Sequence, residues 1–149
     1  MRRAQASAAT LAVLAFVASS CAGPTVTSGQ YRAKVAQTAK AMTGIIVTAQ
    51  HAARLDLDGR MLHTVTDAVV SDAEQDADSV RTTISSRQPP DTASDRLREQ
   101  VDQPVEQAVR LLTDLRIAVR RDDDRAQRTA ADALAGPLAA FDRLSEVGS

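Results

Sequence analysis

Apolar residues recur every three or four positions from Tyr31 onward, which is the spacing of one face of an α-helix. The first run ends before Gly59, a residue suited to the left-handed conformation that often follows a helix. The pattern therefore predicts a helix from about Tyr31 to just before Gly59. Its apolar positions are Val35, Ala39, Met42, Ile46, Ala49 and Ala53.

Two further apolar stripes lie on either side of Pro89-Pro90. Proline disfavours helical backbone at the residue before it, so the pair separates a second helix from a third. Asp91 and Thr92 are suited to cap the third helix, with Asp95 as a capping-box-like partner, and Pro104 predicts a kink or a break within it. The second stripe is Leu62, Val65, Val69, Ala73, Ala77, Val80 and Ile84, and the third is Leu97, Val101, Val105, Ala108, Leu112, Leu115 and Val119.

A fourth stripe follows the acidic run Asp122–Asp124 and is interrupted by Gly136-Pro137. Its positions are Ala130, Leu134, Leu138, Phe141 and Leu144. No alternating pattern typical of a strand extends over a useful length. Four helical segments with short connections predict an all-α domain over residues 31–149, arranged as an antiparallel up-down-up-down four-helix bundle.

The first twenty residues have the parts of a secretory signal. Arg2 and Arg3 supply a basic start, residues 8–17 form an apolar run, and small residues follow at 18–20. An apolar run of about ten residues is too short for a membrane span, which needs about 20. The segment therefore predicts export.

The stretch Ala18-Ser19-Ser20-Cys21 resembles the lipobox of bacterial lipoproteins. The resemblance implies transfer of diacylglyceryl to the Cys21 thiol and cleavage between Ser20 and Cys21. The motif most often carries Leu where this chain has Ala18. Ordinary signal-peptidase cleavage nearby, for instance after Ala22, is the alternative, and its product is a soluble secreted protein.

In the lipoprotein interpretation residues 1–20 are the signal peptide, and residues 21–30 are the lipidated cysteine and a flexible tether. Gly, Pro, Ser and Thr are concentrated in this tether, and that composition cannot build a core. Cys21 is the only cysteine, so it cannot form an internal disulfide. Acylation accounts for this odd thiol in an exported chain.

Charge and aromatic content argue against nucleic-acid binding. The chain has 18 Lys and Arg against 19 Asp and Glu, and two of the basic residues, Arg2 and Arg3, belong to the signal. Aromatic residues make up 2% of the chain and Trp is absent. A nucleic-acid binder typically has a basic face and aromatic stacking groups.

His51, His63 and Asp67 are the only candidates for a metal site, and His63 and Asp67 share a helix face. A metal site needs three or four ligands with supporting contacts, so we interpret both histidines as structural or solvated and expect no metal or other cofactor. The acidic stretch Asp72–Asp78 is interpreted as a solvated face that can meet arginines of a neighbouring helix. Weak calcium binding and docking to a basic partner are its alternatives.

No nucleophile elbow, phosphate loop or dinucleotide motif is present, so we expect no enzyme activity. The expected function is a lipid-anchored, non-catalytic binding or structural accessory on the outer face of the bacterial cytoplasmic membrane. A carrier of metal or small ligands in the envelope and a soluble secreted helical protein are the alternatives. The expected partner is the membrane, through the lipid on Cys21; an envelope protein and a second copy of the chain stay open.

Overall fold

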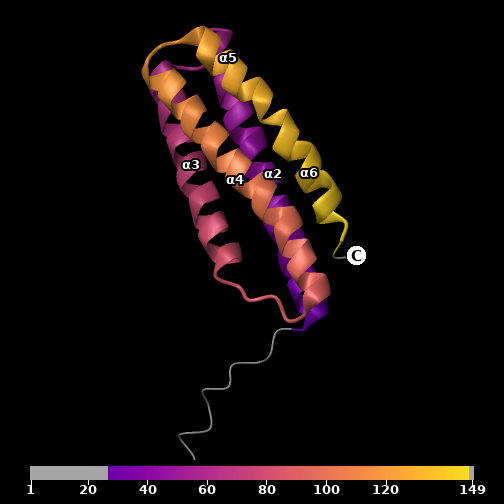
Figure 1. Cartoon of the computed structure of the whole chain (residues 1–149). Coiled ribbons are helices and arrows are strands. Elements are labelled where there is room, and N and C mark those ends of the chain that lie inside the picture. The colour runs from indigo at the N-terminus through magenta and orange to yellow at the C-terminus, as the bar shows by residue number, and fades with distance from the viewer. Residues whose placement is uncertain (1–26, 148–149) are drawn as a thin grey trace, which may run out of the picture.

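The computed structural model describes residues 27–147, which form helices joined by short connections (Figure 1). The segment from residue 27 to residue 147 contains no strand, so the expected all-α fold class is confirmed. The signal segment and Cys21 lie outside the described residues. The helices are α2 (Ser28–Leu57), α3 (His63–Ser85), α4 (Thr92–Arg120), α5 (Asp124–Ala133) and α6 (Ala135–Ser145).

Helix α2 begins at Ser28, three residues before the predicted start. Thr27 and Gln30 form a capping box: the backbone N–H of Gln30 donates to Thr27 Oγ1 at 3.2 Å, and the backbone N–H of Thr27 donates to Gln30 Oε1 at 3.1 Å. Residues 28–30, which composition assigns to the tether, are therefore the first helical turn. At the other end Gly59 has a φ of 67°, as expected of a residue that follows a helix.

The two prolines inside the predicted helices have different effects. Helix α4 runs unbroken through Pro104, so of the kink and the break predicted there as alternatives, the break is wrong. The fourth segment is instead two helices, α5 and α6, with the junction at Leu134. Pro137 lacks the N–H that would bond to the carbonyl of Ala133, four residues earlier, and Ala133 is the last residue of α5.

The predicted core positions of the first and third stripes are all buried. The second stripe is wrong at its start, because Leu62 and Val65 are 73% and 44% exposed, while Thr66 and Val70 take the buried positions. Thr66 is tolerated there because its hydroxyl donates to the carbonyl of Leu62 at 3.4 Å. The largest fully buried apolar or aromatic side chains are Tyr31, Phe141, Met42, Ile46, Leu112 and Leu115.

The helical body has two structurally distinct ends. At the N-terminal pole, which comprises residues 27–34 and 91–97, α2 and α4 begin side by side (Figure 1). The Ser28 hydroxyl there donates to Asp91 Oδ2 at 2.5 Å. At the turn pole, which comprises residues 56–65 and 119–127, α2 ends, α3 begins and α4 gives way to α5. None of the described helices is long and apolar enough to cross a membrane.

Candidate functional site

The structure separates the three candidate metal ligands. His63 Nδ1 lies 3.1 Å from Asp56 Oδ2, while the Asp67 carboxylate receives a 3.0 Å hydrogen bond from Arg120 Nε. His51 is exposed on α2. Residues 27–147 contain no group of three or more His, Cys, Asp or Glu side chains placed to hold a metal ion. The metal-carrier alternative therefore has no ligand set among these residues.

A polar cluster instead forms around Asp56 at the turn pole. The Gln127 side-chain amide donates to Asp56 Oδ2 at 3.2 Å and to the carbonyl of Ala53 at 3.0 Å. His63 approaches the same carboxylate oxygen from the first turn of α3. Asp56 and Gln127 are largely shielded from water, with side-chain exposure of 11% and residue exposure of 1% respectively. The cluster joins the end of α2 to the beginnings of α3 and α5.

Gln127 is a functional position that the sequence analysis missed. It lies three residues before Ala130 and seven before Leu134, so it falls on the apolar face of the fourth stripe. A glutamine at such a position must satisfy its amide inside the protein, because an unpaired buried polar group is costly. The spacing was visible in the sequence, but its partners, more than 70 residues away, were not.

The chemistry available to His63 is limited by what surrounds it. A histidine whose Nδ1 faces a carboxylate presents Nε2 in the opposite direction, as the base of a hydrolytic triad does. The second carboxylate near this ring, that of Asp122, lies 4.0 Å from Nδ1. No serine, threonine or cysteine of residues 27–147 is hydrogen-bonded to the ring. The arrangement accordingly acts as a tie between helices.

The acidic stretch of α3 divides into one inward and three outward side chains. Glu74 faces α4, where it accepts a 2.6 Å hydrogen bond from the Thr113 hydroxyl. It also forms a close ion pair with the Arg116 guanidinium. Burial raises the pKa of Glu74, but the hydrogen bonds from Arg116 and Thr113 outweigh it, so the pKa lies below its usual value. The other three, Asp72, Asp76 and Asp78, are exposed.

Two large apolar side chains are exposed at the turn pole. Leu62 precedes α3 and Val65 lies in its first turn, and both are largely exposed. Asp58 and Asp122 are exposed in the two connections of the same pole. Asp122 has a φ of 53°, in the left-handed region that aspartate enters more readily than most residues. The turn pole thus combines apolar and acidic groups.

The surface also has shallow hollows between helices. One of about 520 Å³ lies between α4 and α6 beside Pro104 and Arg143, and one of about 480 Å³ lies between α4 and α5 beside Ile117 and Arg125. Neither is lined by the Asp56 cluster. A third, smaller groove is at the N-terminal pole.

Comparison of the chain with known protein families, curated proteins and solved structures gave no match. Function must therefore be inferred from the residues of this chain and their geometry.

Proposed function

We propose that this protein is a lipid-anchored accessory of the bacterial envelope, held on the outer face of the cytoplasmic membrane and acting by binding or as a structural component without catalysis. The observation that carries the proposal is the signal-like segment ending at Cys21, in a stretch that resembles a lipobox. The helical body that begins at Ser28 follows this cysteine closely. Two acyl chains on one cysteine are enough for stable membrane attachment.

The proposed architecture is an antiparallel up-down-up-down bundle in which α5 and α6 together take the place of the fourth helix. The helix contacts support it, since α2 packs against α3, α5 and α6, and α4 packs against α3, α5 and α6. Helix α2 also packs against α4. When α5 and α6 follow one another as the two halves of the fourth helix, four helical rods enclose the core.

The use of the buried polar groups supports a binding or structural role. The Gln50 amide donates to the carbonyl of Ala131 at 2.7 Å, and Gln127 and Glu74 likewise bond to neighbouring helices. These groups hold the helices in register. Of the four large apolar side chains that are exposed among residues 27–147, Leu62 and Val65 lie together at the turn pole, where a protein partner could contact them.

The position of Cys21 supports display of that pole away from the membrane. Six residues from Cys21 to Thr27 span at most about 20 Å when fully extended. The 30 residues of α2 extend about 45 Å from the N-terminal pole to the turn pole. An anchor at Cys21 would therefore keep the N-terminal pole near the lipid and place the turn pole within reach of an envelope protein.

The test is the intact mass and the cell fraction of the mature chain. We expect a membrane-bound species that begins at Cys21 and carries diacylglyceryl mass. Cys21→Ala should lose both the added mass and the membrane fraction, whereas Ser19→Ala, which keeps a small residue in the motif, should retain them. An unmodified wild-type chain in the medium would reject the anchor and favour the soluble secreted protein.

A further inference from the structure

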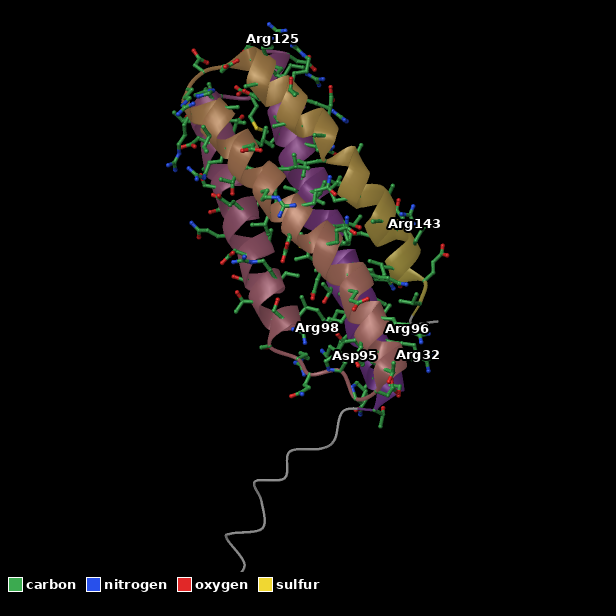
Figure 2. The ribbon with its side chains drawn as sticks, viewed as in Figure 1. Arg32, Asp95, Arg96, Arg98, Arg125 and Arg143 are labelled. Carbon is green, nitrogen blue, oxygen red and sulfur yellow. The ribbon has the colours of Figure 1, made fainter. Side chains whose placement is uncertain are left out.

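A groove of about 310 Å³ lies at the N-terminal pole between the beginning of α2 and the first nine residues of α4, and Val147 after α6 also lines it. Arg32 of α2 and Arg96 of α4 line it together, and both side chains are exposed. Figure 2 shows these two arginines at the same end of the molecule. Within residues 27–147 neither guanidinium takes part in an ion pair. The groove is therefore bordered by two cations whose charge is available to an external anion.

The charges around the groove leave these cations uncompensated by a direct contact. Helix α2 has no acidic residue before Asp56. The Asp91 carboxylate is occupied, because it accepts hydrogen bonds from the Ser28 hydroxyl and from the backbone N–H of Ser94. Asp95 is the exposed carboxylate that remains on the first turn of α4. Attraction of anions to this pole is thus expected to be moderate and to need a high local concentration of negative charge.

A membrane surface supplies that concentration if the chain is anchored at Cys21. The six Cα–Cα steps from Cys21 to Thr27 restrict the start of α2 to within about 20 Å of the lipid, or about two and a half Debye lengths at physiological salt. Guanidinium groups match the geometry of phosphate oxygens and bind them with paired hydrogen bonds. The occupant that fits both the charge and the short link is a layer of anionic phospholipid headgroups.

We propose that the Arg32–Arg96 groove docks the N-terminal pole against anionic phospholipid headgroups. This inference rests on the proposed lipid anchor, which brings the pole to the surface. Docking would fix the orientation of the helical body relative to the membrane. The long axis of α2 then points away from the membrane, and the exposed Leu62 at the turn pole faces the envelope space.

Chemical tethering tests docking without relying on acylation in the cell. The chain that begins at Cys21 keeps every described residue, and its single thiol can be coupled to a maleimide-bearing lipid in vesicles. Tyr31 is the only tyrosine and Trp is absent, so tyrosine fluorescence reports on α2 beside the groove. Quenching by a lipid with a nitroxide on its headgroup then measures how close this pole lies to the surface.

We expect stronger quenching on vesicles that contain phosphatidylglycerol than on phosphatidylcholine alone. Arg32→Gln with Arg96→Gln should weaken docking about fivefold per arginine and about 25-fold together. The matched control is Arg125→Gln with Arg128→Gln, which removes the same charge from exposed positions of α5, away from the groove (Figure 2). This control should leave the quenching unchanged.

Three results would overturn the inference. They are equal quenching on the two kinds of vesicle, equal loss in the two double variants, and displacement by inorganic phosphate but not by chloride at matched ionic strength. The last would indicate a site for a soluble phosphate in place of a membrane surface. If the tethered chain docks on vesicles but Cys21 carries no lipid mass in cells, only the proposed anchor is rejected. If Cys21 carries lipid mass in cells but the tethered chain does not dock, only this inference is rejected.

Discussion

Asp56 at the end of α2 and Gln127 in α5 are joined by an amide-to-carboxylate hydrogen bond of 3.2 Å that is almost wholly buried. The same amide holds the carbonyl of Ala53, so one side chain satisfies two acceptors on α2. Charge-assisted hydrogen bonds of this kind are stronger than neutral ones. The pair fixes where α5 crosses the end of α2 and thereby shapes the turn pole.

Gln127→Leu should destabilise the protein by about 1–3 kcal/mol, because it removes the amide that donates both to the buried Ala53 carbonyl and to the mostly buried Asp56 carboxylate. Urea denaturation followed by circular dichroism measures the loss. Gln103→Leu makes the same chemical change at an exposed position of α4 and should shift stability by less than about 0.5 kcal/mol. Similar stability of the two variants would show that the Gln127 bonds do not support the fold.

Glu74→Gln should cost about 2 kcal/mol at neutral pH, because Glu74 and Arg116 are both roughly four-fifths shielded from water and the change removes one charge of the pair. A double-mutant cycle with Arg116→Gln isolates the interaction between the two side chains. Asp72→Asn on the exposed side of α3 is the control and should cause no loss. A coupling energy near zero in the cycle would contradict the ion pair.

The lowered pKa of Glu74 also sets a pH dependence. Its folded pKa lies below the unfolded value of about 4.3, so its contribution to stability is present above that pH. The contribution is lost as the pH falls through the folded pKa. Glu74→Gln should remove this part of the acid sensitivity.

The register of α3 can be tested with two valines. Val70→Ala should cost about 2 kcal/mol, because Val70 is fully buried and the change removes two buried methyl groups and leaves a small cavity. Val65→Ala, on a side chain that is 44% exposed, should change stability by less than about 0.5 kcal/mol. Equal unfolding midpoints for the two variants would place the buried face where the sequence pattern first put it.

These valines also show how far the apolar pattern could predict the fold. The first and third stripes were predicted correctly, because burial on one side of a long helix imposes a regular repeat. The second was displaced at its start, because Thr66 counts as polar in a pattern although its hydroxyl bonds locally and its methyl group can be buried. The start of α2 was missed for a similar reason, since its cap is made by Thr27 and Gln30, residues that composition associates with tethers.

The candidate site was less predictable from the sequence than the fold. His63 was selected by residue type, but its partner Asp56 lies across a turn. Gln127 and the groove between Arg32 and Arg96 depend on contacts between helices that are distant in the chain. Periodicity reports which face of a helix is buried, and it carries no information on which helices meet.

Tyr31→Phe should leave stability unchanged or raise it by up to about 1 kcal/mol. The Tyr31 hydroxyl is buried without a hydrogen-bond partner among residues 27–147, and burial raises its pKa. Removing the oxygen abolishes this desolvation cost and keeps the ring that fills the core. Tyr31→Leu, which changes the shape of the side chain, should destabilise the protein. A clear loss of thermal stability in Tyr31→Phe would reveal a partner for the hydroxyl.

Asp91 should make the N-terminal pole sensitive to acid. Hydrogen bonds from the Ser28 hydroxyl and from the backbone of Ser94 lower the pKa of Asp91 to about 2. Because its folded pKa is below the unfolded value of about 3.9, Asp91 stabilises the protein above that pH, and the contribution is lost as the pH falls toward the folded pKa. Asp91→Asn retains a capping side chain but removes the titrating carboxyl. The urea concentration at the unfolding midpoint should therefore fall less with decreasing pH, between the unfolded and the folded pKa of Asp91, than it does in the wild type. Asp91→Ala, which also loses the cap, should lower the midpoint at neutral pH.

Asp95→Asn is the control for this experiment, because Asp95 lies in the same first turn of α4, whereas the Ser28 hydroxyl donates to Asp91. It should keep the acid dependence of the wild type. If Asp91→Asn follows the wild-type curve throughout the acid range, then the hydroxyl of Ser28 does not hold the carboxylate. In that case α2 and α4 would be joined at this pole only through the packing of Tyr31 and Leu97 in the shared core.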